Sequence, residues 1–184
     1  MRIIVGSFKG AVLHSPKGAD TRPTSDKVRE ALFDIIGRRI ADASFLDLFW
    51  GTGAVGFEAL SRGASQVTIV EAAQIDLIRK NAAKLKVETS DRFHVILGDA
   101  LKAIHVMEKR NQMFDFIFAD PPWSEGHETE TVNSASGILN FDGTLILEAY
   151  YKTKPPEPAS DQKPGLRLND SRRYGDTALH FYVF

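Results

Sequence analysis

An aspartate followed by two prolines and a tryptophan is the stretch of this sequence best suited to chemistry. Asp120, Pro121, Pro122 and Trp123 directly follow the apolar run 115–119. The prolines set φ to about −65° and remove two backbone donors, so they predict a stiff corner at the end of a strand. That corner would present a carboxylate, the bare Pro121 carbonyl and an aromatic face together. Two acceptors and a ring suit a flat base with an exocyclic amine, although the same residues could simply end a strand in a turn.

A glycine-rich turn lies earlier in the chain, between an apolar run and a helical stretch. Gly51, Gly53 and Gly56 have the spacing G-x-G-x-x-G, which permits a tight turn and lets a ligand lie against the backbone. Glu71 ends the next apolar run, 20 residues after Gly51, where a carboxylate can accept hydrogen bonds from ribose hydroxyls. The pattern predicts a nucleoside cofactor but does not separate NAD(H) from S-adenosylmethionine.

Three further features favour the methyl donor. Asp47 lies inside the first predicted strand, where its carboxylate could receive the ammonium of a methionine moiety. Asp99 ends the third predicted strand, where it could meet an adenine amine. An antiparallel strand is also expected at the end of the sheet, which departs from the usual dinucleotide-binding sheet. Each aspartate could instead cap a helix or a turn, and Asp99 fits that alternative best.

Strands and helices alternate along most of the chain, which predicts βαβ units and a largely parallel sheet. Thr24 or Ser25 could cap a helix whose apolar stripe runs from Val28 to Ile36 and leaves Arg29 outside it. The later strands are predicted at 45–49, 66–70, 93–97, 115–119 and 144–148, with helices ending near 62 and 86 and another at about 100–110. Residues 2–14 predict a hairpin, residues 152–164 a surface loop, and the runs 166–169 and 178–184 a closing antiparallel hairpin.

Composition narrows the class of protein. The 184 residues are 43% hydrophobic, which suits one domain with a substantial core. Residues 1–29 carry six Lys or Arg and two Asp, a basic arm on a mildly acidic body that suits a polyanion or is merely solvated. The chain has no cysteine, and its five histidines show no metal-ligand spacing, so we expect no metal. No apolar run has the length of a signal peptide or membrane span, so a cytoplasmic protein is expected.

Several blocks of residues, spread from end to end, carry a resemblance to a known family. These blocks are Met1-Arg2-Ile3-Ile4 with Gly6 and Gly10, Thr21-Arg22-Pro23-Thr24 with Val28-Arg29-Glu30-Ala31-Leu32-Phe33, Asp47-Leu48-Phe49, Glu58-Ala59-Leu60-Ser61-Arg62-Gly63-Ala64, Val70-Glu71, Asp120-Pro121-Pro122, and Tyr174-Gly175-Asp176-Thr177. The sequence resembles the RsmD family, bacterial (guanine-N2)-methyltransferases of 16S ribosomal RNA. The Arg-Pro-Thr block is far more specific than the glycine loop, which many methyltransferases share.

The resemblance implies an α/β fold of the class I S-adenosylmethionine-dependent methyltransferases, which is Rossmann-like. Its sheet would have seven mostly parallel strands and an antiparallel end strand, with a short N-terminal β-hairpin added. Residues 1–20 would form an RNA-contacting arm and residues 21–184 the methyltransferase domain. The implied substrate is the exocyclic amine of one guanine, position 966 in the usual 16S rRNA numbering. The implied partner is 16S rRNA or a small-subunit assembly particle, and we expect a monomer.

The family's functional residues carry over onto matching positions here. The cofactor loop would comprise Asp47, Phe49, Gly51, Thr52, Gly53 and Gly56, with Glu71 on the ribose and Asp99 and Ala100 by the adenine. The target base would lie at Asp120, Pro121, Pro122 and Trp123. Candidate RNA contacts are Lys9, Lys17, Arg22, Arg29, Arg172 and Arg173. For Arg22 and Arg29 the alternative is an ion pair with Asp26 or Glu30 that shapes the helix entry. Trp50 departs from the family, which usually has a small residue at that position. At position 123 the family has various aromatic residues, so Trp123 keeps the stacking role.

Other functions remain open from the residues. The acceptor could be DNA adenine, another RNA base or a protein glutamine, although aspartate rather than asparagine at position 120 argues against glutamine and the chain has no long insertion for DNA recognition. An NAD-dependent oxidoreductase is disfavoured because no Tyr-Lys or histidine-centred acid–base set stands out. A non-catalytic ribosome-assembly factor with this fold is disfavoured by the intact corner at Asp120.

Overall fold

The computed structural model describes residues 1–15, 24–49, 51–122, 126–159 and 165–184. Trp50, Trp123, Lys17 and Arg22 therefore lie outside the described residues. In chain order the elements are α1 (Asp26–Ile36), a 3-10 turn η1 (Gly37–Ile40), β1 (Ser44–Leu48), α2 (Ala54–Ser61), β2 (Gln66–Glu71), α3 (Ile75–Leu85), β3 (Phe93–Leu97), α4 (Ala100–Lys109), β4 (Phe114–Ala119), α5 (Glu128–Ala135), η2 (Ser136–Ile138), β5 (Leu139–Tyr150), β6 (Arg167–Tyr174) and β7 (Thr177–Val183). In the described part of the chain, no helix is both long and apolar enough to cross a membrane.

The seven strands form one sheet in the order β3-β2-β1-β4-β5-β7-β6. Every neighbouring pair is parallel except the two that involve β7. The predicted closing hairpin is confirmed, but the antiparallel strand does not end the sheet: β7 lies between β5 and β6, and β6 forms the edge. The burial of the two strands explains this order, because β7 is buried on both faces whereas most of β6 is exposed.

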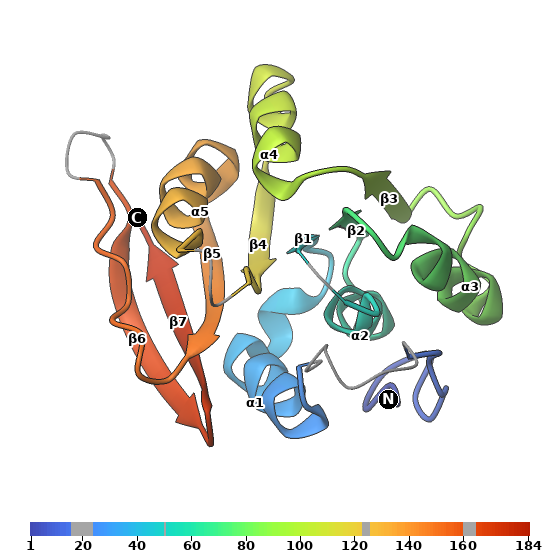
Figure 1. Cartoon of the computed structure of the whole chain (residues 1–184). Coiled ribbons are helices and arrows are strands. Elements are labelled where there is room, and N and C mark those ends of the chain that lie inside the picture. The colour runs from blue at the N-terminus through green and yellow to red at the C-terminus, as the bar shows by residue number, and fades with distance from the viewer. Residues whose placement is uncertain (16–23, 50, 123–125, 160–164) are drawn as a thin grey trace.

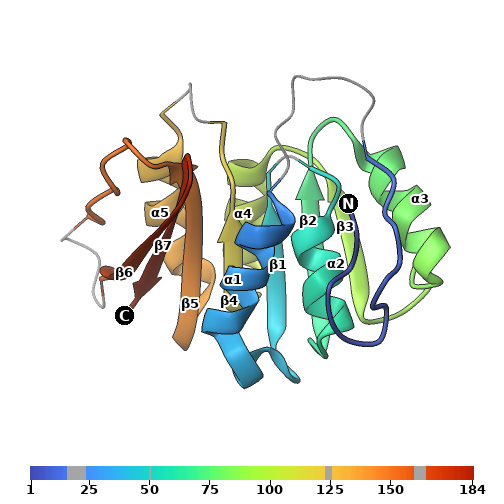
Figure 2. The ribbon, with the colours of Figure 1, turned by 90° about the horizontal axis from the view of Figure 1, so that it is seen from below.

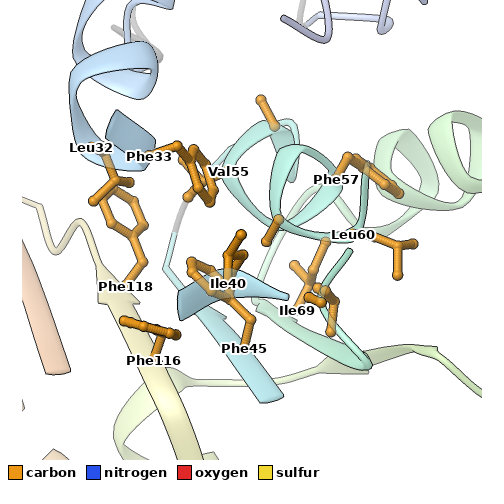
Figure 3. Close-up of a cluster of buried hydrophobic side chains, with 14 of the residues drawn as sticks. Leu32, Phe33, Ile40, Phe45, Val55, Phe57, Leu60, Ile69, Phe116 and Phe118 are labelled. Atoms are coloured by element: carbon orange, nitrogen blue, oxygen red, sulfur yellow. The ribbon is translucent and has the colours of Figure 1, made fainter. Parts of the chain in front are cut away.

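Helices cover both faces of the sheet, α4 and α5 on one and α1, α2 and α3 on the other (Figure 1). The same division is visible from a second direction (Figure 2). Alternate residues of each strand feed two cores: Phe45 of β1 packs with α1 and α2, while Leu46 belongs to the cluster under α4 and α5. In the first cluster the Phe45 ring stacks with Phe33 at 6.1 Å and with Phe116 at 6.4 Å between centroids (Figure 3).

Three elements differ from the expectation. α5 was not predicted at all, β5 begins at Leu139, five residues before the expected strand, and β6 continues to Tyr174, five residues beyond the run 166–169. The α5 sequence, Glu-Thr-Glu-Thr-Val-Asn-Ser-Ala, has low intrinsic helix propensity. Its helical form depends on tertiary packing, since Val132 and Ala135 are fully buried against the cluster that includes Ile138.

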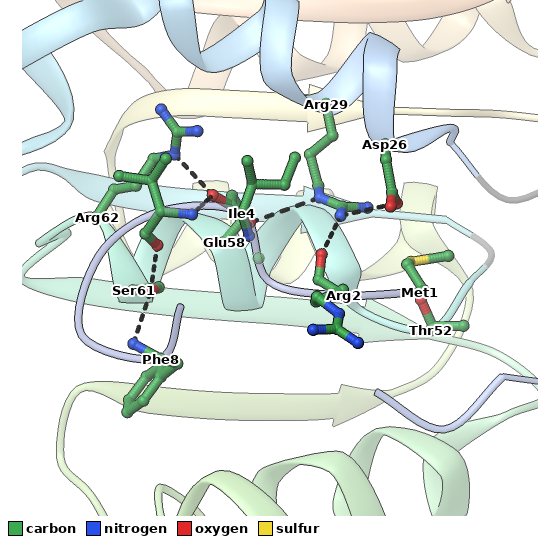
Figure 4. Close-up of polar contacts among 12 residues, drawn as sticks. Met1, Arg2, Ile4, Phe8, Asp26, Arg29, Thr52, Glu58, Ser61 and Arg62 are labelled. Carbon is green, nitrogen blue, oxygen red and sulfur yellow. Dashed lines mark hydrogen bonds and ion pairs between the residues drawn. The ribbon is translucent and has the colours of Figure 1, made fainter. Parts of the chain in front are cut away.

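The N-terminal segment is a hairpin that packs onto α2. Arg2 and Val12 form an antiparallel bridge, and the side chains of Ile3 and Leu13 are buried in the core. The carboxylate of Glu58 in α2 accepts hydrogen bonds from the backbone N–H groups of Ile4 at 2.8 Å and Val5 at 3.0 Å (Figure 4). The hairpin therefore shares the core and the buried polar contacts of the domain.

Arg29 holds this arrangement together from α1. Its side chain is fully buried; Nη2 donates to the Arg2 carbonyl at 2.6 Å and to Asp26 Oδ1 at 3.0 Å, and Nε lies 3.6 Å from Glu58 Oε2 (Figure 4). The expectation of Arg29 as an RNA contact is wrong, because its guanidinium has no exposed surface to offer a phosphate. The alternative, an ion pair with Asp26 at the helix entry, is confirmed, and Arg29 belongs to the buried face of α1.

Replacement of the Glu58 carboxylate should make the protein easier to unfold. Glu58→Ala removes the acceptor of two backbone N–H groups and leaves Arg29 with one carboxylate partner fewer in the core, so we expect the free energy of unfolding to fall by about 3–5 kcal/mol. Urea unfolding followed by circular dichroism measures the change.

Glu157→Ala is the matched control, because Glu157 forms an ion pair with Lys154, at 2.7 Å, on the exposed surface. Its loss should hardly change stability. Equal midpoints for the two variants would contradict a structural role for the buried carboxylate.

Candidate active site

The glycine loop and the Asp120 corner meet at one edge of the sheet. β1 and β4 are parallel neighbours, with Leu48 opposite Ala119, so the segments that follow them emerge side by side. The Asp120 N–H donates to the Leu48 carbonyl at 3.4 Å across this junction. The strand order reverses between β1 and β4, and such switch points are where open α/β sheets bind ligands. The structure thus brings together the two motifs that the sequence singled out.

Close packing explains the glycines of the loop. Gly53 has φ 69° and precedes α2, and a Cβ there would lie 2.8 Å from Ile69 Cδ1. A Cβ on Gly56 would lie 3.1 Å from Asp47 Oδ2. Thr52, within the loop, is buried. Phe49, just before the loop, adopts φ 74°, a left-handed conformation that is rare outside glycine. The loop therefore runs close to β1 and β2, with glycine at two positions where a side chain would clash with its neighbours.

Asp47 is a buried carboxyl group beneath this loop. Its Oδ2 accepts a hydrogen bond from the Gly56 N–H at 2.9 Å. Burial raises the pKa of Asp47 from 3.8 to about 7, and this effect outweighs the lowering by the Gly56 N–H. The negative charges of Glu71 and Glu148 raise the pKa further. Ionised Asp47 would gain from a cation at this position.

Glu71 ends β2 as a second buried carboxylate. Its Oε2 accepts from the Gly51 N–H at 3.1 Å, and its Oε1 accepts from the N–H groups of Ala73 at 2.7 Å and Gln74 at 3.0 Å. A carboxylate has about four acceptor positions, so these three bonds fix its orientation and leave about one for a ligand. Glu71 ties the glycine loop to the end of the second strand.

Asp99 caps α4, as the alternative interpretation proposed. Its Oδ1 accepts from the Lys102 N–H at 2.9 Å, and its side chain is exposed beyond the end of β3. Ala100, the first residue of α4, is buried. A capping role occupies one carboxylate oxygen and leaves the other able to accept from a ligand, so capping and ligand binding are compatible for this residue.

The corner after β4 is rigid and close to the core. Pro121 is buried and Pro122 half-buried. In β5, the next parallel strand, Glu148 lies level with Asp120, and its buried carboxylate accepts a hydrogen bond from Thr24 Oγ1 at 2.9 Å. This contact joins the residues just before α1 to the strand beside the corner. From the sequence, Thr24 was considered as a possible helix cap, a position that Ser25 occupies, and Glu148 was given no role.

Among the described residues, the remaining RNA candidates do not form one patch. Lys9 is exposed on the N-terminal hairpin beside α2, whereas Arg172 and Arg173 are exposed on β6, the last strand of the sheet (Figure 1). Arg172 forms an ion pair with Asp170 at 2.8 Å. An RNA that touched both groups would have to cross the face that carries the Asp120 corner.

Asn81 is the functional candidate that sequence reasoning missed. Its side chain is fully buried in α3; Nδ2 donates to the carbonyls of Thr52 and His14, both at 3.2 Å, and Oδ1 accepts from the His14 N–H at 2.7 Å. It therefore joins the N-terminal hairpin to the glycine loop. Met1 reinforces this link, since its Sδ lies 3.3 Å from Thr52 Oγ1 (Figure 4). The signal was a single amide on the apolar face of α3, next to Ile78 and Ala82.

Among the described residues, no group of three or more His, Cys, Asp or Glu side chains is placed to hold a metal ion. The carboxylates at the site instead face backbone N–H groups. Asp47, Glu71 and Asp99 each accept at least one such bond. The site presents acceptors for ammonium, hydroxyl and amine groups.

Comparisons with known proteins agree with this geometry. The family model described as "Conserved hypothetical protein 95" matches residues 1–183. "Putative rRNA methyltransferase YlbH" of Bacillus subtilis is 35% identical over 186 residues, which cover 99% of this chain and 98% of that protein. "Ribosomal RNA small subunit methyltransferase D" of Escherichia coli K12 is 38% identical over 152 residues, which cover 81% of this chain and 71% of that protein.

A solved structure described as "Putative methyltransferase yhhF from Escherichia coli" has a TM-score of 0.81 at 31% identity, covering 99% of this chain and 96% of that chain. This similarity and the seven-stranded, mostly parallel sheet identify the class I methyltransferase fold. Together with the match along almost the whole chain, they show that the protein belongs to the RsmD family.

Proposed function

We propose that this protein transfers a methyl group from S-adenosylmethionine to the exocyclic N2 amine of one guanine, position 966, in 16S rRNA. The observation that carries the proposal is the Asp120-Pro121-Pro122 corner beside the glycine loop at the switch point of the sheet. The names of the relatives support the substrate class, since one is described as a small-subunit rRNA methyltransferase. The protein would act in the cytoplasm as a monomer, on 16S rRNA or a small-subunit assembly particle.

The carboxylates at the edge of the sheet fit the polar groups of S-adenosylmethionine. Asp47 would receive the ammonium of the methionine moiety, because a buried carboxyl with a raised pKa gains from a cation. Glu71 would accept from the ribose hydroxyls, and Asp99 with Ala100 would lie by the adenine. Phe49, Thr52 and the glycines would shape the loop around the cofactor. The cofactor, when bound, supplies an electrophilic methyl group on a sulfonium.

Asp120 would orient the nucleophile. The lone pair of a guanine N2 amine is delocalised into the ring, so the site must turn it toward the methyl group. Asp120 and the Pro121 carbonyl can each accept one amine hydrogen, which aims the lone pair and stabilises the positive charge that develops on nitrogen. Asp120 can take the proton afterwards, with positioning as its larger contribution. Trp123, which lies outside the described residues, would stack on the base and contribute about 1–3 kcal/mol.

The target guanine must leave its stack to reach this corner, as bases do in other enzymes that modify them. Lys9, Lys17, Arg22, Arg172 and Arg173 would contact phosphates and hold the flanking RNA. Such contacts position the strand without reading its sequence, so the corner itself would select the guanine amine.

Transfer of labelled methyl from S-adenosylmethionine to 16S rRNA from cells that lack the activity tests the proposal. The RNA is offered naked and as ribonucleoprotein, and nucleosides are then analysed. One N2-methylguanosine at position 966 is expected. Label on adenine in DNA, on another RNA base or on protein would assign a different acceptor, and no transfer to any acceptor with cofactor binding intact would favour a non-catalytic assembly factor.

Asp120→Ala should slow the chemical step while cofactor binding persists. We expect kcat to fall by about 10²–10³-fold, as when one group that stabilises developing charge is removed. The Kd for S-adenosylmethionine, measured by calorimetry, should stay within about twofold of wild type, because the cofactor carboxylates lie on other strands. Asp142→Ala, which removes an exposed carboxylate from β5, should leave both values unchanged. An equal loss of cofactor affinity would show that Asp120 has been assigned the wrong role.

The raised pKa of Asp47 predicts two opposite pH effects. Without cofactor, the folded protein holds a proton on Asp47 that the unfolded chain has released, so the stability contributed by this group is present below about pH 4 and falls as pH rises toward 7. Binding of an ammonium group requires the ionised carboxylate, so affinity for S-adenosylmethionine should rise over the same interval.

Asp47→Asn should abolish both dependences and weaken cofactor binding by about 10–100-fold, the contribution of one charge-assisted hydrogen bond. Calorimetric titrations and urea unfolding between pH 5 and 8 measure the two effects. A wild-type affinity that stays level across this interval would remove Asp47 from the ammonium site.

A further inference from the structure

A cluster of aromatic and basic side chains lies at the carboxyl ends of β5 and β6, on the same side of the sheet where Asp120 follows β4. Tyr150 ends β5, with Tyr151 directly after it, and Arg173 lies near the end of β6. β5 and β6 run in the same direction, since both pair antiparallel with β7. Their carboxyl ends therefore lie beside the carboxyl end of β4. We call Tyr150, Tyr151, Lys152 and Arg173 the β5–β6 cluster.

The guanidinium of Arg173 lies over the ring of Tyr151. Its Cζ is 3.6 Å from the ring centroid, and its Nε donates to the Gly175 carbonyl at 2.9 Å. Tyr151 is held in turn, because its N–H donates to the Asp176 carbonyl at 3.0 Å and its ring meets Tyr150 edge-on at 4.9 Å. The guanidinium is thus held by a ring on one side and by a hydrogen bond at its edge.

The charges of the cluster have no evident structural use. Nearby cations are neutralised: Arg172 pairs with Asp170 at 2.8 Å and Lys154 with Glu157 at 2.7 Å. Within the described ranges, neither Arg173 nor Lys152 forms an ion pair, although the Lys152 Nζ lies 5.6 Å from the Tyr151 ring. Arg173 is exposed, so its side chain can be reached from solvent.

Register places the cluster near the proposed position of the target base. Ala119 of β4 lies opposite Leu147 of β5, so Tyr151 is three residues beyond the level of Asp120 on the neighbouring strand. With a rise of about 3.3 Å per residue and strands about 4.8 Å apart, the two Cα atoms are on the order of 10 Å from each other. An RNA strand whose target guanine sat at Asp120 would pass the cluster within a few nucleotides.

We propose that Arg173, held over the ring of Tyr151, stacks on a nucleobase that flanks the target guanine. The inference rests on the proposed function and adds a base-stacking site to it. Unpaired RNA bases stack on guanidinium planes as well as on aromatic rings. Since Nε is committed to Gly175, the Nη groups remain to donate to an acceptor on the base or on its phosphate, and Lys152 adds a second cation beside them. In this view Arg173 positions the RNA by stacking on a base, in addition to offering a positive charge to a phosphate.

Arg173→Lys separates stacking from simple charge, because lysine keeps the charge but has no plane. The variant is compared with Tyr151→Phe, which keeps the supporting ring, Tyr151→Ala, which removes it, and Lys109→Ala, which removes one exposed cation from the last turn of α4. Affinity is measured with a short single-stranded RNA that contains guanine and one 2-aminopurine, moved along the strand one position at a time. The quenching of 2-aminopurine fluorescence reports stacking directly, and the KM for 16S rRNA gives the consequence for methyl transfer.

Arg173→Lys and Tyr151→Ala should each weaken RNA binding by about 5–100-fold and abolish quenching at one position, as expected for the loss of one stacked base. The salt dependence of binding should be unchanged in Arg173→Lys, since the number of neutralised phosphates is the same. Tyr151→Phe and Lys109→Ala should resemble wild type, and the Kd for S-adenosylmethionine should be unaffected in every variant.

The proposal would be overturned if Arg173→Lys kept wild-type RNA affinity and wild-type quenching. It would also be overturned if Lys109→Ala lost as much RNA affinity as Arg173→Lys. These outcomes are distinct from failure of the proposed function, which would appear as absence of methyl transfer by the wild-type protein. Because RNA binding is measured at equilibrium without the cofactor, the stacking site is tested even if the methylated position proves to be another one.

Discussion

The parallel pairing of β1 with β4 is the constraint on which the rest of the site depends. Leu48 lies opposite Ala119, and both strands are buried on both faces, so neither can slip by a residue without moving apolar side chains to the wrong layer. This register brings the glycine loop and the Asp120 corner to one edge although about 70 residues of chain separate them. The helices on either face then serve mainly to bury the sheet that sets this register.

Buried polar contacts connect the periphery to that edge. Glu58 and Arg29 hold the N-terminal hairpin against the domain, and Asn81 joins the end of the hairpin to the glycine loop. Replacement of a whole buried ion pair by apolar residues can be neutral for stability, whereas removal of one partner leaves a buried charge unpaired and is costly. The N-terminal segment of this chain is therefore joined to the glycine loop through specific buried contacts.

Charge at the site is arranged in two zones. Asp47, Glu71 and Glu148 gather negative charge beneath the switch point, which suits ammonium and hydroxyl groups and raises the pKa of Asp47. Positive charge lies outside this zone, on Arg173 and Lys152 at one side and on Lys9 at the other. A ligand with a cationic end and a polyanionic substrate can thus approach one edge of the sheet without competing for the same groups.

Local sequence determined the parts of this protein that depend on chain neighbours alone. Apolar runs predicted most strands, Thr24 or Ser25 together with Gly37 predicted the ends of α1, and the glycine spacing and the two prolines predicted the turns that carry chemistry. These signals suffice because a cap, a fixed φ or an apolar run is a property of a few consecutive residues.

Tertiary structure decided what depends on partners far along the chain. Arg29 was assigned to the solvent face because an arginine off an apolar stripe is normally exposed, whereas Glu58 and the Arg2 carbonyl make its burial favourable. The helix α5 forms on residues of low propensity because Val132 and Ala135 are buried, and β7 takes the inner position because it buries both of its faces. Asn81 showed no role in the sequence, and Arg173 was expected only to contact RNA phosphate. An amide that bridges two loops and a guanidinium placed over a ring exist only when distant segments are folded side by side.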